Sequence, residues 1–186
     1  MQRRSFFKAC AGLSIAAVDI TANRANAKPK VKSPEKMRPQ VGDILVHDTI
    51  EGDVKPILVS ELKLNVQQTM AFPQDSQSKI VRNGSRFNKV MVIRLNPEEM
   101  DDHTRKNSVD GIVAYSAICT HQGCDVNSYI DDKKEFFCFC HLSRFNPLNA
   151  GEVTNGPATK KLAMLPLEKI GDQLIVRKRF TRKPGP

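Results

Sequence analysis

The segments CTHQGC (residues 119–124) and CFCHLS (residues 138–143) are the most informative part of this sequence. Each contains a cysteine and a histidine at close spacing, together with one further cysteine. Thiolate sulfur and imidazole nitrogen are the ligands that hold zinc or iron–sulfur clusters in proteins. The two segments are therefore candidates for the two halves of one metal site, with each half on its own loop.

Two other interpretations of these segments stay open on residue types alone. Four cysteines in an exported domain can form a disulfide framework, with three possible connectivities, but both histidines then have no role. A structural zinc site made of two cysteines and two histidines leaves the other two cysteines without a role. Either would make the protein a binding module rather than a redox protein. His47 and His103 lie outside both segments and are expected to be ordinary strand or surface histidines.

The pattern Cys-Thr-His-x-Gly-Cys followed by Cys-x-Cys-His-x-Ser resembles the Rieske iron–sulfur family over about residues 115–158. The resemblance implies a [2Fe-2S] cluster with two cysteines on one iron and two histidines on the other. The implied ligands are Cys119, Cys138, His121 and His141. It also implies a disulfide between Cys124 and Cys140, as in the cytochrome bc branch of the family, which would tie the two loops together.

Further residues match positions around the cluster in this family. Ser143 matches the residue whose hydroxyl bonds a bridging sulfide, and Gly156 and Pro157 match the loop that covers the third side of the cluster. Phe145 stands where the cytochrome bc branch often has Tyr. The resemblance therefore implies a reduction potential below that of a Tyr-containing relative, because one hydroxyl that would stabilise the reduced cluster is missing.

Three departures separate the chain from the cytochrome bc branch. Phe139 stands where many relatives have Pro, Leu142 where many have Gly, and Gln122 where quinol-oxidising relatives often have Leu. The run CHLSRFNP (residues 140–147) is more similar to the Rieske small subunit of arsenite oxidase. We therefore expect the electron-transfer subunit of an oxidoreductase, most similar to that small subunit and not itself catalytic. The iron–sulfur subunit of a quinol:cytochrome c reductase is the alternative.

Charge suggests the kind of partner. The formal net charge is +9, and many of the cations lie in residues 28–38 and 177–183. Basic runs are usually solvated; the sharper hypothesis is a docking surface for an acidic partner or an anionic membrane. No nucleic-acid-binding motif is present, which argues against nucleic acid. The resemblance implies a catalytic subunit or a quinol-oxidising complex as one partner and a c-type cytochrome as the acceptor.

The first 27 residues are typical of an export signal. RRSFFK (residues 3–8) is a twin-arginine pattern, and Ala25-Asn26-Ala27 fits a small-x-small cleavage site. Residues 9–18, which include Cys10, would rise only about 15 Å as a helix, against a hydrocarbon core of about 30 Å. We therefore expect twin-arginine export to the periplasm and cleavage, with a retained membrane anchor as the alternative. The periplasm also permits disulfides.

The remaining sequence predicts an all-β domain. Residues 28–40 are expected to be an extended Lys/Pro-rich linker, residues 41–180 the domain, and residues 181–186 a basic tail. Short runs rich in Val, Ile and Leu predict strands at 44–47, 57–59, 70–72, 90–95, 112–118, 162–167 and 173–176.

Two local signals refine this prediction. Gly171-Asp172 predicts a hairpin turn, and Asn96-Pro97 predicts the start of a short helix that ends near Lys106. Period-two patterning with short spacing favours a sandwich or a small barrel. The resemblance specifies a Rieske-type sandwich of antiparallel sheets with a small cluster-binding subdomain inserted near the end.

Overall fold

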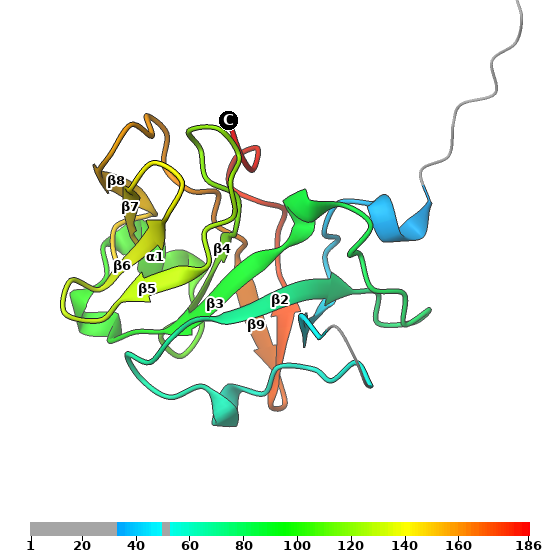
Figure 1. Ribbon diagram of the computed structural model, residues 1–186. Helices are drawn as coiled ribbons and strands as arrows, with labels where there is room; N and C mark the ends of the chain where they lie inside the picture. Colours follow the sequence, from blue (N-terminus) through cyan, green and yellow to red (C-terminus); the bar gives the residue numbers. More distant parts are fainter. Residues whose placement is uncertain (1–32, 50–52) are drawn as a thin grey trace, which may run out of the picture. The chain divides into compact units, whose positions relative to one another are not determined.

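The computed structural model describes residues 33–49 and 53–186. The expected signal at 1–27 and the first part of the expected linker lie outside the described residues. Within the described part, ten strands form two antiparallel sheets, which confirms the all-β fold class (Figure 1). No helix among these residues has both the length and the apolar character needed to cross a bilayer.

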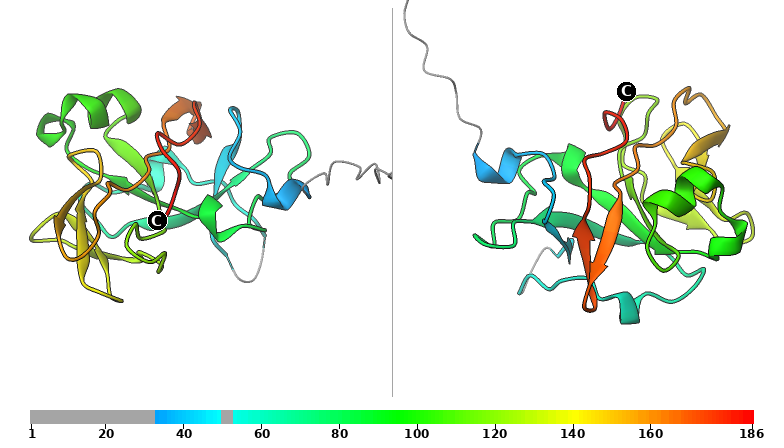
Figure 2. Two further views of the ribbon diagram at one scale, coloured as in Figure 1. Left: turned by 90° about the horizontal axis from the view of Figure 1, so that it is seen from above. Right: turned by 180° about the vertical axis from the view of Figure 1, so that it is seen from behind.

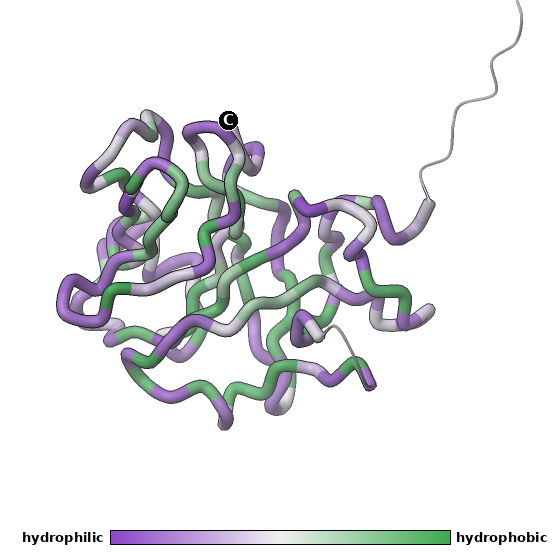
Figure 3. Tube along the Cα trace, viewed as in Figure 1, coloured by the Kyte–Doolittle hydropathy of each residue, from purple (hydrophilic) through white to green (hydrophobic). Residues whose placement is uncertain are grey.

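The larger sheet has six strands in the order β4-β3-β2-β1-β10-β9 and forms the base of the domain. Its strands are β1 (Ile44–His47), β2 (Thr69–Gln74), β3 (Val90–Arg94), β4 (Ile112–Ser116), β9 (Leu167–Ile170) and β10 (Gln173–Val176). The central strands β2 and β3 are green to pale in Figure 3, whereas many of the surrounding turns are purple. Continuous apolar runs of this kind are typical of strands that are covered on both faces.

The smaller sheet has four strands in the order β5-β6-β7-β8 and is inserted between β4 and β9 (Figure 2). Its strands are β5 (Ser128–Ile130), β6 (Glu135–Cys138), β7 (Ser143–Asn146) and β8 (Glu152–Asn155). The expected subdomain inserted near the end of the domain is therefore present. Residues 119–124 join β4 to β5, and residues 138–143 turn the chain from β6 into β7.

The two faces of the base sheet bury different cores. Met91 and Ile93 of β3 pack into a core that also contains Phe136 and Phe145 of the inserted sheet. Their neighbours Val90 and Val92 face the opposite core, which is built from base residues. Successive residues of a strand point to opposite faces, so β3 serves both cores. The inserted sheet therefore shares one hydrophobic core with the base.

Several predicted elements differ from the structure. The strand expected at 162–167 lies at Leu167–Ile170 instead, because the turn at Gly171-Asp172 pairs Gln173 with Ile170. The run expected at 57–59 contributes only isolated bridges and enters a 3-10 turn, Val59–Glu61. The expected helix is divided into a 3-10 turn, Pro97–Glu99, and α1 (Asp102–Asn107).

A second capping residue explains the divided helix. The side chain of Asn96 accepts a hydrogen bond from the Glu98 N–H, as predicted, but Asp101 also accepts one from the Thr104 N–H, at 2.6 Å. Asp101 has extended backbone angles, as a capping residue does. One helix therefore ends and another begins within the segment that the sequence pattern assigned to a single helix.

A buried ion pair anchors residues 33–40 to the base sheet. Arg82 donates to Asp43 through Nε at 2.7 Å and through Nη2 at 2.9 Å, and both side chains are 3% exposed. Arg82 also donates to the Pro34 carbonyl oxygen, and the Gly84 N–H donates to the Glu35 carbonyl oxygen at 3.0 Å. This part of the expected linker therefore packs on the domain and contains a 3-10 turn at Pro34–Lys36.

Candidate metal centre

Residues 119–124, called loop 1 here, form a tight turn closed by their own backbone. The Cys119 N–H donates to the Cys124 carbonyl oxygen at 2.8 Å, and the Gly123 N–H donates to the Cys119 carbonyl oxygen at 3.0 Å. Gly123 has a φ of +78°, a left-handed conformation that glycine adopts without strain. The turn leaves Cys119 2% exposed, whereas His121 is half-buried.

Residues 138–143, called loop 2 here, turn the chain between β6 and β7, whose register pairs Cys138 with Ser143. Cys138 is 1% exposed, while the four residues that follow it are exposed. Leu142 has a φ of +60°, which a β-carbon makes unfavourable. This conformation gives a physical reason for the glycine that many relatives have at this position.

The two loops pair the candidate ligands, since each loop contributes one cysteine and one histidine. Cys119 and Cys138 are the cysteines of the described residues that form no disulfide, and both are buried. The rings of His121 and His141 lie 4.6 Å apart between centroids, at an interplanar angle of 86°. The arrangement places two thiols inside and two imidazoles nearer the surface.

One polar atom at this site lacks a partner among the described residues. Nδ1 of His121 is buried and accepts or donates no hydrogen bond there. Buried polar atoms are nearly always satisfied, so an unpartnered one requires an explanation, and a bound ion is one such explanation. Together with two close thiols and a second imidazole, this nitrogen fits a metal cluster that takes sulfur and nitrogen donors.

Burial also affects the ionisation of the inner thiols. It raises the pKa of Cys119 above its usual value, because a thiolate loses hydration inside the protein. The neighbouring Cys138 raises the pKa further, whereas the His121 N–H and the Ser143 hydroxyl lower it. A thiolate at Cys119 therefore needs a positive charge nearby, and bound iron would supply one.

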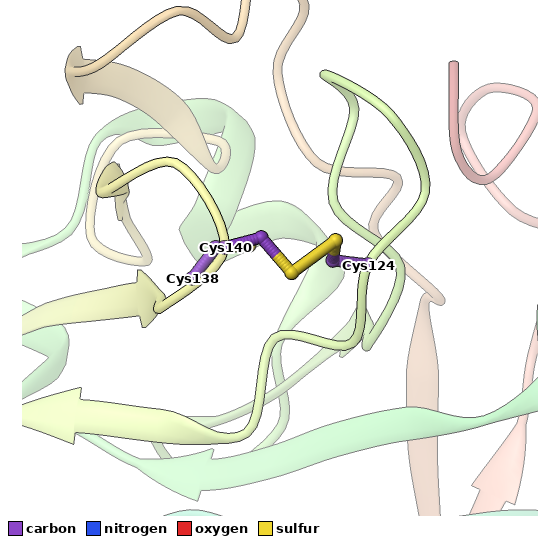
Figure 4. A group of neighbouring side chains, drawn as sticks. All are labelled: Cys124, Cys138 and Cys140. Carbon is purple, nitrogen blue, oxygen red and sulfur yellow. A yellow bond between two sulfur atoms is a disulfide. The ribbon is translucent and has the colours of Figure 1, made fainter.

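The other two cysteines form a disulfide across the loops. Cys124 of loop 1 and Cys140 of loop 2 are bonded, with their Cα atoms 6.5 Å apart, as the resemblance implied. The sulfur atoms of Cys124, Cys138 and Cys140 lie within 4.8 Å of one another (Figure 4). Because two of these sulfurs are bonded to each other, only Cys138 can offer a thiolate to a metal.

Residues 156–160, called loop 3 here, tie both other loops together. The Ala158 N–H donates to the Ser143 hydroxyl oxygen at 3.2 Å, and the Thr120 hydroxyl donates to the Lys160 carbonyl oxygen at 2.6 Å. Gly156 lies directly against Ser143, where an added β-carbon would come within 2.5 Å of the Ser143 Cα. With the disulfide, these contacts join every pair of loops.

The structure also locates the remaining predicted residues. Pro157 lies in loop 3 and is exposed, whereas Phe145 is fully buried in β7, within the core shared by both sheets. His47 pairs with Glu61, with 2.6 Å between Nε2 and Oε1, and His103 lies in α1. These two histidines belong to elements outside the three loops, as the sequence analysis expected.

Two residues at the site were missed by sequence reasoning. Thr120 lies within the first cysteine–histidine segment, but nothing in its neighbours indicates a bond to loop 3. Arg86 donates to the Gly123 carbonyl oxygen and pairs with Asp125 at 2.8 Å, which ties loop 1 to the base. Its backbone partner is 37 residues away and carries no sequence signal.

Comparison with known proteins agrees with this geometry. The family described as the Rieske [2Fe-2S] domain matches residues 65–166. The cytochrome bc1 complex Rieske iron-sulfur subunit of Streptomyces lividans is 35% identical over 128 residues, which cover 67% of this chain and 72% of that protein. The subunit of the same name from Streptomyces coelicolor is also 35% identical over 128 residues, but the match covers only 35% of its length.

A solved structure was also compared with the chain. The cyanobacterial plasma membrane Rieske protein of Synechocystis PCC 6803 superposes with a TM-score of 0.36 and 28% identity, covering 48% of this chain and 77% of that protein. The family match covers more than half of the sequence, and its cysteine and histidine segments occupy the two facing loops. The chain is therefore a member of the Rieske family, an electron-transfer protein whose domain binds a [2Fe-2S] cluster.

Proposed function

We propose that this protein is an exported one-electron carrier that acts as the Rieske subunit of a bc1-type quinol-oxidising complex and passes electrons to a c-type cytochrome. The names of the bc1 relatives support the kind of complex, and the twin-arginine pattern supports export to the periplasm. The single observation that carries the proposal is the pair of buried free thiols beside two imidazoles on loops tied together.

In this proposal, Cys119 and Cys138 hold one iron and His121 and His141 hold the other. When bound, the cluster supplies a one-electron redox couple. The buried cysteines keep their iron away from solvent, while His141 is exposed and offers the side on which a partner can approach. The Ser143 hydroxyl accepts a hydrogen bond from the Ala158 N–H, and it lowers the pKa of the Cys119 thiol. It would therefore stabilise negative charge at that cysteine.

The ligand assignment can be tested by spectroscopy of the purified protein. The reduced wild type is expected to show the rhombic, low-g electron paramagnetic resonance signal of Rieske centres and to contain iron and acid-labile sulfide. His141→Cys and His141→Ala should each abolish that signal, because an imidazole ligand is lost. His103→Ala, a histidine in α1, is the matched control and should leave it unchanged. An unaltered signal in both His141 variants would refute the assignment.

A second candidate function rests on residues near the cluster. Phe145 and Leu142 match the arsenite-oxidase type of Rieske small subunit more closely than the cytochrome bc branch. In that case the electron donor would be a molybdenum-containing catalytic subunit rather than a quinol. Inhibitor-sensitive quinol oxidation by the complex isolated from native membranes would support the bc1-type assignment. Co-purification with a molybdenum enzyme and no quinol oxidation would support the second candidate.

A further inference from the structure

The segment of residues 177–186, called the basic strap here, is rich in cations and is fixed to the domain. It carries five Lys or Arg residues and no acidic residue. The Arg177 N–H donates to the Pro166 carbonyl oxygen at 2.9 Å, and the Thr181 N–H donates to the Met164 carbonyl oxygen at 2.9 Å. The Thr181 hydroxyl accepts from the Met164 N–H at 3.0 Å. The chain therefore stays attached to the domain past residue 180, where the sequence predicted that a basic tail would begin.

The strap ends against loop 1. Pro184 and Gly185 are buried, and a β-carbon on Gly185 would lie 2.9 Å from the Phe87 ring and 3.3 Å from Ile118. At Gly123 of loop 1, a β-carbon would lie 3.7 Å from Pro186. Figures 1 and 2 show the strap, in red, running from the β9–β10 hairpin to the same end of the domain as loop 1. The end of the strap therefore lies beside the loop that carries His121.

Three cations of the strap, together with Arg38, line a hollow of about 250 Å³. The hollow is lined by Phe180, two prolines and four cationic side chains, which are Arg38, Arg179, Arg182 and Lys183. None of these four forms an ion pair within the described part of the chain. Unpaired guanidinium groups around a hollow are suited to receiving carboxylates, which they bind through two hydrogen bonds.

Nearby acidic groups do not cancel this charge. On the adjoining segments, Asp125 is paired with Arg86 at 2.8 Å, and Glu152 lies 3.8 Å from Lys161. Asp101 lines a neighbouring hollow together with Lys161 and Arg182, so one carboxylate faces two cations there. The surface of the strap therefore keeps an excess of positive charge, which attracts anions and steers their approach.

The exposed side chains of loop 2 complete the surface. Phe139 is 64% exposed and Leu142 is 57% exposed, on either side of His141 in the sequence. A small apolar centre with charged residues around it is the usual composition of a protein–protein interface. Leu142 keeps its apolar side chain despite its left-handed backbone, which is consistent with a contact role.

We propose that the basic strap and the exposed apolar residues of loop 2 together form the docking surface for an acidic redox partner protein, whose carboxylates enter the hollow lined by the strap. This inference rests on the proposed electron-transfer function and further specifies that the partner protein is acidic. An acidic protein fits better than an anionic membrane, because the strap that carries three of these cations ends against loop 1, near which a partner must come to exchange electrons. Charge complementarity of this kind sets orientation and association rate.

The test compares two variants with the same change in net charge. Arg182→Glu with Lys183→Glu reverses two cations of the hollow. Lys55→Glu with Lys63→Glu is the matched control, because both lysines are exposed and form no ion pair in the described part of the chain. They belong to the segment between β1 and β2 that carries the Val59–Glu61 turn, which Figure 1 draws in teal at the end of the domain opposite loop 1. A neutral pair, Arg182→Gln with Lys183→Gln, should give an intermediate effect if charge is the cause.

The measurement is stopped-flow oxidation of each reduced holo-protein by an acidic c-type cytochrome and by a basic one of similar potential. With the acidic cytochrome at low ionic strength, the strap variant should react about tenfold more slowly than wild type, and the control less than about threefold. With the basic cytochrome, the strap variant should react faster than wild type. These differences should shrink at about 1 M salt, where the Debye length is about 3 Å.

Equal slowing of the strap and control variants would overturn the proposal, because net charge rather than the strap would then set the rate. So would a strap variant that reacts normally but loses binding to phosphatidylglycerol vesicles, since the strap would then be a membrane surface. The electron paramagnetic resonance signal of the wild type and of each variant is recorded before the kinetic measurement. A wild type without that signal would contradict the proposed function itself, which keeps the two failures distinct.

Discussion

At the residue scale, the backbone angle of Leu142 shows whether its departure from the glycine of many relatives is neutral or has an energetic cost. Its side chain is 57% exposed and its φ is +60°. The residue is therefore strained locally without being needed for a buried core. From the sequence alone, Leu in place of Gly is only a departure from relatives. The backbone angle shows that the departure has an energetic cost, because a left-handed conformation is unfavourable by about 1–2 kcal/mol for a residue with a β-carbon.

We expect Leu142→Gly to raise the unfolding free energy by about 0.5–1 kcal/mol. Relief of the left-handed strain exceeds the extra entropy that glycine gives the unfolded chain. The shift would be measured by thermal unfolding of the holo-protein. Phe139→Gly is the control, since Phe139 is exposed in the same loop but is not among the positive-φ residues. It should destabilise the protein, and a shift of the same sign in both variants would contradict the strain argument.

The candidate ligands could be named from the sequence because their signal is local: each cysteine–histidine pair lies within one short segment. The contacts that fix those ligands could not be named. Thr120 bonds a carbonyl oxygen of Lys160, and Arg86 bonds that of Gly123. A backbone carbonyl has the same chemistry at every residue, so no residue type marks it as a partner. Only the fold brings these groups within reach.

At the scale of elements, hydrophobic runs predicted every base strand except β9. The strand expected at 44–47 coincides with β1, and the Gly171-Asp172 turn joins β9 to β10. The four strands of the inserted sheet were not predicted. β8, for example, is half-buried to exposed along its length and reads Glu-Val-Thr-Asn, which gives little hydrophobic signal. Such strands are specified by pairing with their neighbours and by the loops that they carry.

Loop 3 gives a prediction at this scale. Gly156→Ala is expected to lower the unfolding free energy by about 3 kcal/mol and to reduce iron retention. Its φ is +86°, and the new methyl group would meet the Ser143 Cα at 2.5 Å, which would push loop 3 away from loop 2. Thermal unfolding and iron content of the purified variant measure both effects.

Gly171→Ala is the matched control for this substitution. Gly171 also has a positive φ, of +61°, but no atom lies within 4 Å of the added β-carbon. It should therefore cost only the conformational penalty, about 1 kcal/mol, with normal iron content. If both alanine variants lost iron equally, close packing of loop 3 on Ser143 would not explain the effect.

At the scale of the whole molecule, both tyrosines of the chain are buried. Burial raises the pKa of Tyr129 to about 12 and that of Tyr115 further. In the unfolded chain a tyrosine has a pKa of about 10. Below about pH 10 the two tyrosines are neutral in both states, so their ionisation takes nothing from the free energy of unfolding. As the pH rises from about 10 toward the pKa values in the folded protein, each tyrosine lowers the free energy of unfolding by about 1.4 kcal/mol per pH unit.

Tyr129→Phe is expected to remove one of these two contributions to the pH dependence. Urea unfolding, followed by circular dichroism, should show a shallower fall in stability between about pH 10 and pH 12 than in wild type. At pH 8 the variant should be at least as stable, because the Tyr129 hydroxyl is buried without a hydrogen-bond partner among the described residues. Identical alkaline slopes for the two proteins would show that Tyr129 does not titrate as its burial implies.

The core shared by both sheets has a mechanical consequence. Phe136 and Phe145 pack against Met91 and Ile93, so the inserted sheet cannot rock on the base without opening a hydrophobic interior. Any movement of loops 1 and 2 between an electron donor and an acceptor must therefore carry the base sheet along as one rigid body. A hinge for such a movement would have to lie outside this core, and its position would set how far the loops move.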